Sequence, residues 1–135
     1  MNIENNERDS IMTNEMGLAL TQDIIDRINL EVTGLICRRL EHVKSIILYG
    51  SCATRDYTRD SDIDIAVIVD IKRSMSDSVS EILAHVATEL AMKYFAVVNC
   101  IFIPYSEYQE KKSWYPFYRN IAQEGVVLYG SEVLC

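Results

Sequence analysis

Residues 48–70 read LYGSCATRDYTRDSDIDIAVIVD and carry the clearest structural signal in this chain. The short β-branched run at 45–49 ends at Gly50, which predicts a strand that stops in a tight turn. Polar turn-forming residues fill positions 51–61 and predict a loop. Residues 62–70 contain two aspartates near their start and are otherwise apolar on both faces, which is typical of a central strand covered on both sides.

Helical periodicity surrounds this strand-loop-strand unit. Apolar residues recur at helical spacing over two long segments, and shorter apolar runs follow the second of them. This order predicts an α/β (α+β) fold in which helices pack on a small mixed β-sheet. We predict helices at 21–43, 74–95, 106–112 and 117–124, and further strands at 96–103 and 126–130, the last of them at a sheet edge.

The size and composition of the chain predict one folded domain. Its 135 residues are 49% hydrophobic, which is enough for an independent core. We place the single domain at 18–135 and interpret residues 1–17, which are rich in Asn, Glu and Asp, as a tail or a frayed helix. Neither a signal peptide nor an apolar run of membrane-spanning length is visible. We therefore expect a cytoplasmic protein that does not enter a membrane.

The charge and the metal-binding residue types exclude several function classes. Lys plus Arg number 13 against 20 Asp plus Glu, so the net charge is -7 and binding to nucleic acid is disfavoured. The four cysteines lack the close spacing of zinc and redox motifs and are interpreted as free thiols. Two histidines are too few for a multi-histidine metal site.

Two features near residues 50–64 indicate phosphate and cation chemistry. Gly50 and Ser51 directly follow a strand, so backbone N–H groups and a hydroxyl can face an anion. Asp62 and Asp64 stand two positions apart, which places both carboxylates on one strand face with Cα atoms roughly 6 to 7 Å apart. Such a pair can hold a divalent cation. Unpaired charges on a buried strand would cost several kcal/mol, so a counter-ion is expected there.

The complete pattern is Gly50-Ser51, residues 52–61, and then Asp62-Ile63-Asp64. It resembles the signature of the minimal nucleotidyltransferases of the DNA polymerase β superfamily, and the predicted element order agrees with that family over 21–130. The resemblance implies the nucleotidyltransferase fold. It also implies transfer of a nucleotidyl group, with AMP from ATP as the expected group, to a hydroxyl while pyrophosphate leaves.

The resemblance implies a role for each candidate residue. The Gly-Ser pair is expected to begin a helical turn that binds the triphosphate, and the two aspartates are expected to bind Mg²⁺ or Mn²⁺. Cations of the loop can offset phosphate charge. The expected nucleotide-binding residues are Gly50, Ser51, Arg55, Arg59 and Ser61, and the expected metal ligands and catalytic residues are Asp62 and Asp64.

Two departures from the family pattern affect the expected activity. The family usually has a third carboxylate on the next core strand, and the matching catalytic position here is Asn99. An amide can coordinate through oxygen, but it brings no charge and does not accept the proton of a nucleophile. The loop glycine that the family often has is also missing, since the loop reads Ala53-Thr54-Arg55. We therefore expect nucleotide binding with slow transfer.

The sequence is compatible with several acceptors and several partners. Chains of this size and pattern resemble the antitoxin half of bacterial two-gene systems, in which adenylylation modifies a helical HEPN-type toxin. Self-association is the other expected contact. The alternatives are a catalytically weakened domain that binds nucleotide or its partner, and an aminoglycoside-type enzyme that modifies small molecules, which the short chain disfavours. The aromatic segment 105–118 is more typical of core and interface packing than of base stacking.

Overall fold

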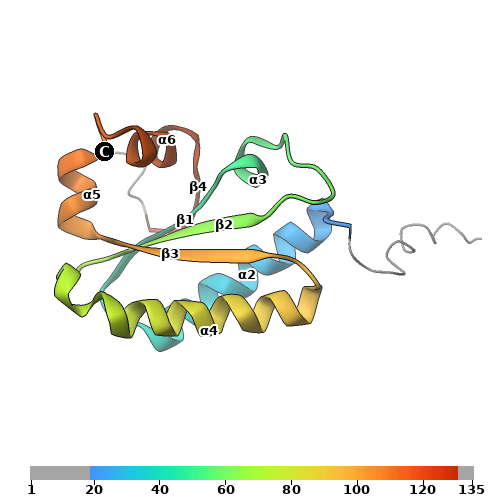
Figure 1. Cartoon of the computed structure of the whole chain (residues 1–135), viewed down its shortest axis with the longest axis horizontal. Helices are drawn as coiled ribbons and strands as arrows, with labels where there is room; N and C mark the ends of the chain where they lie inside the picture. The colour runs from blue at the N-terminus through green and yellow to red at the C-terminus, as the bar shows by residue number, and fades with distance from the viewer. Residues whose placement is uncertain (1–18, 131–135) are drawn as a thin grey trace, which may run out of the picture.

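The computed structural model describes residues 19–130, which form a four-stranded mixed sheet (Figure 1). Strand β1 runs antiparallel to β2 and β4, whereas β2 and β3 are parallel. The predicted mixed sheet and the edge position of the last strand are therefore confirmed. The predicted tail at 1–17 lies outside the described residues. In sheet order, the strands are β3 (Val98–Pro104), β2 (Ile63–Val69), β1 (Val43–Tyr49) and β4 (Val126–Tyr129).

Helices cover the two faces of the sheet unequally. The two long helices α2 and α4 pack along one face, while the shorter helices α5 and α6 pack on part of the other (Figure 1). None of the helices within residues 19–130 is long and apolar enough to cross a membrane. The helices are α2 (Gln22–Arg39), α3 (Ser51–Thr54), α4 (Ser76–Tyr94), α5 (Tyr105–Lys111) and α6 (Pro116–Glu124), and a 3-10 turn, η1 (Arg73–Met75), precedes α4.

Strand β2 is buried on both faces, as its sequence predicts. Ile63, Ile65 and Val67 lie in the core beneath α2 and α4. Ala66 and Ile68 lie in a second core beneath α5 and α6. All five side chains have an exposed fraction of 0%. Side chains alternate along a strand, so Asp64 points to the same face as Ala66 and Ile68.

The first helix ends earlier than its periodicity predicts. We predicted a helix to residue 43, but α2 ends at Arg39 and Leu40 is already extended. His42 then has a positive φ of 65°, and β1 begins at Val43. Leu40 and Val43 continue the helical spacing of apolar residues although they belong to the connection and the strand. Hydrophobic periodicity alone therefore misses this boundary.

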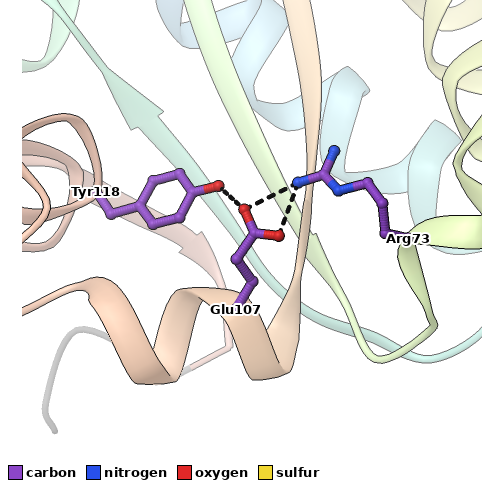
Figure 2. Close-up of polar contacts among 3 residues, drawn as sticks. All are labelled: Arg73, Glu107 and Tyr118. Atoms are coloured by element: carbon purple, nitrogen blue, oxygen red, sulfur yellow. Dashed lines mark hydrogen bonds and ion pairs between the residues drawn. The ribbon is translucent and has the colours of Figure 1, made fainter.

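A polar cluster of Arg73, Glu107 and Tyr118 joins η1, α5 and α6 (Figure 2). Two hydrogen bonds of 3.0 and 2.9 Å run from Arg73 Nη2 to the Glu107 carboxylate, which also accepts one from the Tyr118 hydroxyl. Burial alone would raise the pKa of Glu107, but the bonds from Tyr118 and Arg73 outweigh it and hold the pKa below its ordinary value. The cluster therefore links α5 and α6 to each other and to η1.

Glu107→Gln is expected to lower the free energy of unfolding by about 1 kcal/mol at neutral pH, because a neutral amide binds Arg73 less strongly than a carboxylate does. Because folding lowers the pKa of Glu107, ionisation of its carboxyl group stabilises the fold. This contribution to stability is complete above the pKa of the unfolded chain and is lost as the pH falls through the pKa of the folded protein. The difference between the two proteins should therefore shrink at an acidic pH below the folded pKa of Glu107. Urea denaturation at both pH values measures it. A difference that persists unchanged at the acidic pH would show that the carboxylate charge is not the cause.

Candidate active site

The turn after β1 is built around Gly50. This residue has a φ of +77°, which side chains rarely adopt, and it directly precedes α3. The N–H groups of Ala53 and Thr54 both donate to the Gly50 carbonyl at 3.0 and 3.2 Å. A Cβ atom at Gly50 would lie only 2.7 Å from Asp64 Oδ2, so the backbone passes directly beside that carboxylate. The helical turn that the Gly-Ser pair was expected to begin is therefore present at the start of the predicted loop.

Gly50→Ala should lower the free energy of unfolding by about 1 to 3 kcal/mol, because alanine is strained at this φ and its methyl group would collide with Asp64. Gly34→Ala is the matched control in the interior of α2. There an added Cβ meets only the far end of the flexible Arg38 side chain at 3.1 Å, so a gain of about 0.5 to 1 kcal/mol is expected. Chemical denaturation of both variants measures these changes. Equal effects in the two variants would contradict the special conformation of Gly50.

The structure brings Asp62, Asp64 and Asn99 together. Asp64 pairs across the sheet with Tyr49 of β1 and with Asn99 of β3. Asn99 Nδ2 donates to Asp62 Oδ2 at 3.3 Å and to Asp64 Oδ1 at 3.1 Å. Oxygen atoms of both carboxylates therefore converge on one point, where the amide nitrogen stands.

This donor set fits a hard divalent cation. Carboxylate oxygens are the ligands that Mg²⁺ and Mn²⁺ take in proteins, and here two of them face the same point. Within residues 19–130, no group of three His, Cys, Asp or Glu side chains is arranged to hold a metal. Further ligands would have to come from the Asn99 oxygen, from a substrate or from water. A phosphate-bearing substrate would supply both ligand oxygens and negative charge.

The two aspartates are not buried charges, and our prediction that burial requires a counter-ion there is wrong. Asp62 precedes β2 and is exposed, and Asp64 is half-buried at the open end of the strand. Solvent reaches both carboxylates, so they carry a smaller desolvation cost than the apolar sequence around them suggests. The convergence of the two carboxylates, rather than their burial, supports a cation site here.

The loop cations do not join this cluster in the described structure. Arg55 is exposed at the end of α3 with a φ of 69°, a conformation in which the missing loop glycine would be unstrained. Arg59 and Ser61 line a separate cavity of about 230 Å³ beside Leu20 and Phe95. The Ser61 hydroxyl accepts a hydrogen bond from the Thr58 N–H at 2.8 Å, so it stabilises a local turn. Their predicted contacts with a nucleotide stay predictions.

Three other ionisable groups near the aspartates stay protonated at neutral pH. Burial, together with the nearby Asp64, raises the pKa of Tyr49 to about 12. Burial, together with Asp64 and Asp62, raises the pKa of the Cys52 thiol to about 11. Burial raises the pKa of the Cys100 thiol to about 12. The Cys52 thiol also donates to the Asp62 carbonyl at 3.4 Å. These groups therefore support the site by packing and do not supply a ready nucleophile or base.

An aromatic residue that the sequence did not single out contacts Tyr49, which lies next to Asp64. Phe117, at the start of α6, contacts the Tyr49 ring edge to face, with 5.7 Å between centroids and an interplanar angle of 88°. Tyr49 also lines an open depression of about 540 Å³ together with Asp64 and Asn99. In the sequence Phe117 looks like an ordinary apolar position of a short helix, so only the cross-sheet contact with Tyr49 reveals it.

A sequence profile described as "Polymerase beta, Nucleotidyltransferase" matches residues 31–133, which is well over half of the chain. The chain belongs to this nucleotidyltransferase family. The nucleotidyltransferase domain is also 38% identical over 87 residues to a protein of Methanocaldococcus jannaschii that is provisionally named a protein adenylyltransferase. That match covers 64% of this chain and 79% of the relative.

Solved structures share the fold of this nucleotidyltransferase domain. A variant MntA–HepT toxin–antitoxin complex has a TM-score of 0.54 and 17% identity, covering 77% of this chain and 74% of that chain. A toxin–antitoxin structure with AMP-PNP has a TM-score of 0.53 and 19% identity, and the match covers 84% of this chain and 76% of that chain. A complex of tri-AMPylated Shewanella oneidensis HEPN toxin with its MNT antitoxin has a TM-score of 0.50 and 17% identity, covering 83% and 75%. At these identities, the similarity establishes the fold.

Proposed function

We propose that this nucleotidyltransferase domain transfers AMP from Mg²⁺-bound ATP to a hydroxyl group of a partner protein. The observation that carries the proposal is the convergence of Asp62 and Asp64 directly beside the Gly50 turn. A cation on the carboxylates and a triphosphate on the turn would be neighbours in this arrangement. That is the requirement for attack on a phosphate whose charge has been offset.

Each residue of the cluster has a distinct proposed role. Gly50 and Ser51 bind the β and γ phosphates of the nucleotide, and Asp62 and Asp64 hold Mg²⁺ or Mn²⁺. When bound, the cation offsets the negative charge of the reacting phosphate and of the pyrophosphate that leaves. The acceptor oxygen forms a bond to the α phosphorus, the bond to the β,γ-pyrophosphate breaks, and the hydroxyl proton passes to solvent. Asn99 orients the two carboxylates, but its amide does not accept that proton.

The similar proteins support a protein acceptor. The Methanocaldococcus jannaschii relative is named for protein adenylylation, and one structure of similar fold holds an AMPylated HEPN toxin beside its MNT antitoxin. We propose a HEPN-type toxin as the partner of this chain. A net charge of -7 disfavours nucleic acid as the alternative acceptor, because phosphate backbones would be repelled. The cytoplasm, where ATP and Mg²⁺ are available, is the proposed location.

A second function, nucleotide-dependent binding without efficient transfer, is favoured by Asn99. A carboxylate at that position would assist both the cation and the proton transfer, and the amide assists neither well. In this case the domain would bind Mg²⁺-ATP and contact its partner without modifying it quickly. Binding and transfer therefore need separate measurements.

Calorimetric titration of ATP into the full chain tests the binding part of the proposal. We expect ATP to bind at least about tenfold more tightly with Mg²⁺ than with EDTA, because the two carboxylates repel a triphosphate that has no cation. The same metal dependence should disappear in the Asp62→Ala/Asp64→Ala double variant. Equal affinities in the wild-type protein and the double variant would contradict the assigned site.

A further inference from the structure

Phe117 and Tyr49 form an aromatic wall next to the carboxylates of the proposed active site. Tyr49 is the residue immediately before Gly50, and its backbone pairs with Asp64. The Phe117 ring packs edge to face on Tyr49. The wall therefore starts beside the carboxylate cluster and extends toward α6.

The Phe117 side of this wall packs against residues that are held in place by burial and hydrogen bonds. The Phe117 ring lies 5.9 Å from the ring of Tyr118, which is only 7% exposed. Tyr118 in turn donates to Glu107, which is bonded to Arg73 (Figure 2). An aromatic side chain whose neighbour is fixed in this way loses little conformational entropy when a ligand packs on it.

Phe117 itself remains 42% exposed despite these contacts. Ile121, one turn further along α6, is by contrast 1% exposed and lies in the core beneath the helix. Packing in the core therefore does not account for the exposed part of Phe117. That part is available to a planar ligand that reaches the end of β1.

We propose that Phe117, backed by Tyr49, is the surface on which the purine base of the nucleotide packs. This inference rests on the proposed function, which puts the triphosphate on Gly50 and Ser51. Tyr49 immediately precedes that turn, so a nucleotide bound there by its phosphates has its base within reach of the wall. Stacking of a base on an aromatic side chain strengthens binding by about tenfold or more, and it favours the larger purine surface over a pyrimidine.

The test compares two ligands that differ in whether they carry a base. Titration calorimetry of the full chain measures the affinities of Mg²⁺-ATP and of Mg²⁺-tripolyphosphate. Phe117→Ala should weaken ATP binding about tenfold and leave tripolyphosphate binding unchanged. Phe117→Leu keeps an apolar side chain against Tyr49 but lacks the flat ring, so it should lose the same affinity. Phe117→Trp offers a larger ring and should retain the wild-type affinity for ATP.

Trp114→Ala is the matched control, because Trp114 is 57% exposed between α5 and α6 and packs edge to face on Tyr115 rather than on Tyr49. It should change neither affinity. Unchanged ATP affinity in Phe117→Ala and Phe117→Leu would overturn this inference but not the proposed function. The exposed side chain would then be left as a contact for a protein partner. An equal loss for both ligands would also overturn the inference, since the effect would then be structural. Failure of the wild-type chain to bind either ligand would overturn the proposed function and this inference with it.

Discussion

Asp64→Asn is expected to reduce the Mg²⁺-dependent transfer of AMP from ATP by at least about 100-fold. Asp64 is held on two sides, because Oδ1 accepts a hydrogen bond from Asn99 and Oδ2 lies against the Gly50 backbone. Asparagine has nearly the same shape and can occupy the same space. It removes the negative charge, however, and leaves Asp62 as the one carboxylate in the cluster. The loss should therefore appear in cation binding and in transfer rather than in folding.

Release of pyrophosphate from ATP, followed at saturating Mg²⁺, measures this loss. Asp70→Asn is the matched control, since Asp70 is an exposed aspartate just beyond the opposite end of β2. The control should retain wild-type transfer and the same response of the melting temperature to Mg²⁺. Equal rates in the Asp64→Asn variant and the wild-type protein would contradict the proposed metal ligand.

Asn99→Asp is expected to raise the rate of transfer by about 100-fold while changing the affinity for ATP much less. A carboxylate at this position would face Asp62 and Asp64 across the distances of 3.3 and 3.1 Å that the amide nitrogen now spans. It could take part in cation binding and accept the proton of the attacking hydroxyl. Both effects act on the reacting oxygen, whereas the triphosphate is bound mainly by the turn and the first cation.

The same substitution should have a clear effect on stability. Without a cation, three carboxylates would replace two carboxylates bridged by an amide, and like charges at this separation repel. The melting temperature of Asn99→Asp in EDTA should fall below that of the wild-type protein, and Mg²⁺ should raise it by more than it raises the wild type. If transfer and the Mg²⁺ response both stay unchanged, position 99 does not belong to the cation site.

The part of the architecture that could be predicted from sequence is the part governed by short-range patterns. The nearly continuous apolar run of β2 predicts burial on both faces, and the five fully buried residues 63, 65, 66, 67 and 68 confirm it. Gly50 predicts a turn, and its positive φ and close approach to Asp64 explain why a residue without a side chain stands there. The family and its fold follow from the same motif.

Some features were not predictable in the same way, either because the local pattern is ambiguous or because they depend on long-range packing. The end of α2 is hidden because apolar residues continue past Arg39 with helical spacing. The solvent exposure of Asp62 depends on where β2 starts relative to β3, and the position of Arg59 depends on how the loop folds toward Leu20. The contact of Phe117 with Tyr49 joins residues far apart in sequence, and no local pattern indicates it.

The most direct test of nucleotidyl transfer uses ATP labelled at either the α or the γ phosphate. The full chain is incubated with Mg²⁺ and with the protein that co-purifies with it, and protein-bound label is then measured. The proposed function predicts that the α label becomes protein-bound, that the γ label leaves as pyrophosphate, and that both processes disappear when Asp62 and Asp64 are replaced by asparagine. Incorporation of the γ label instead, or incorporation of the α label that survives the double replacement, would contradict it.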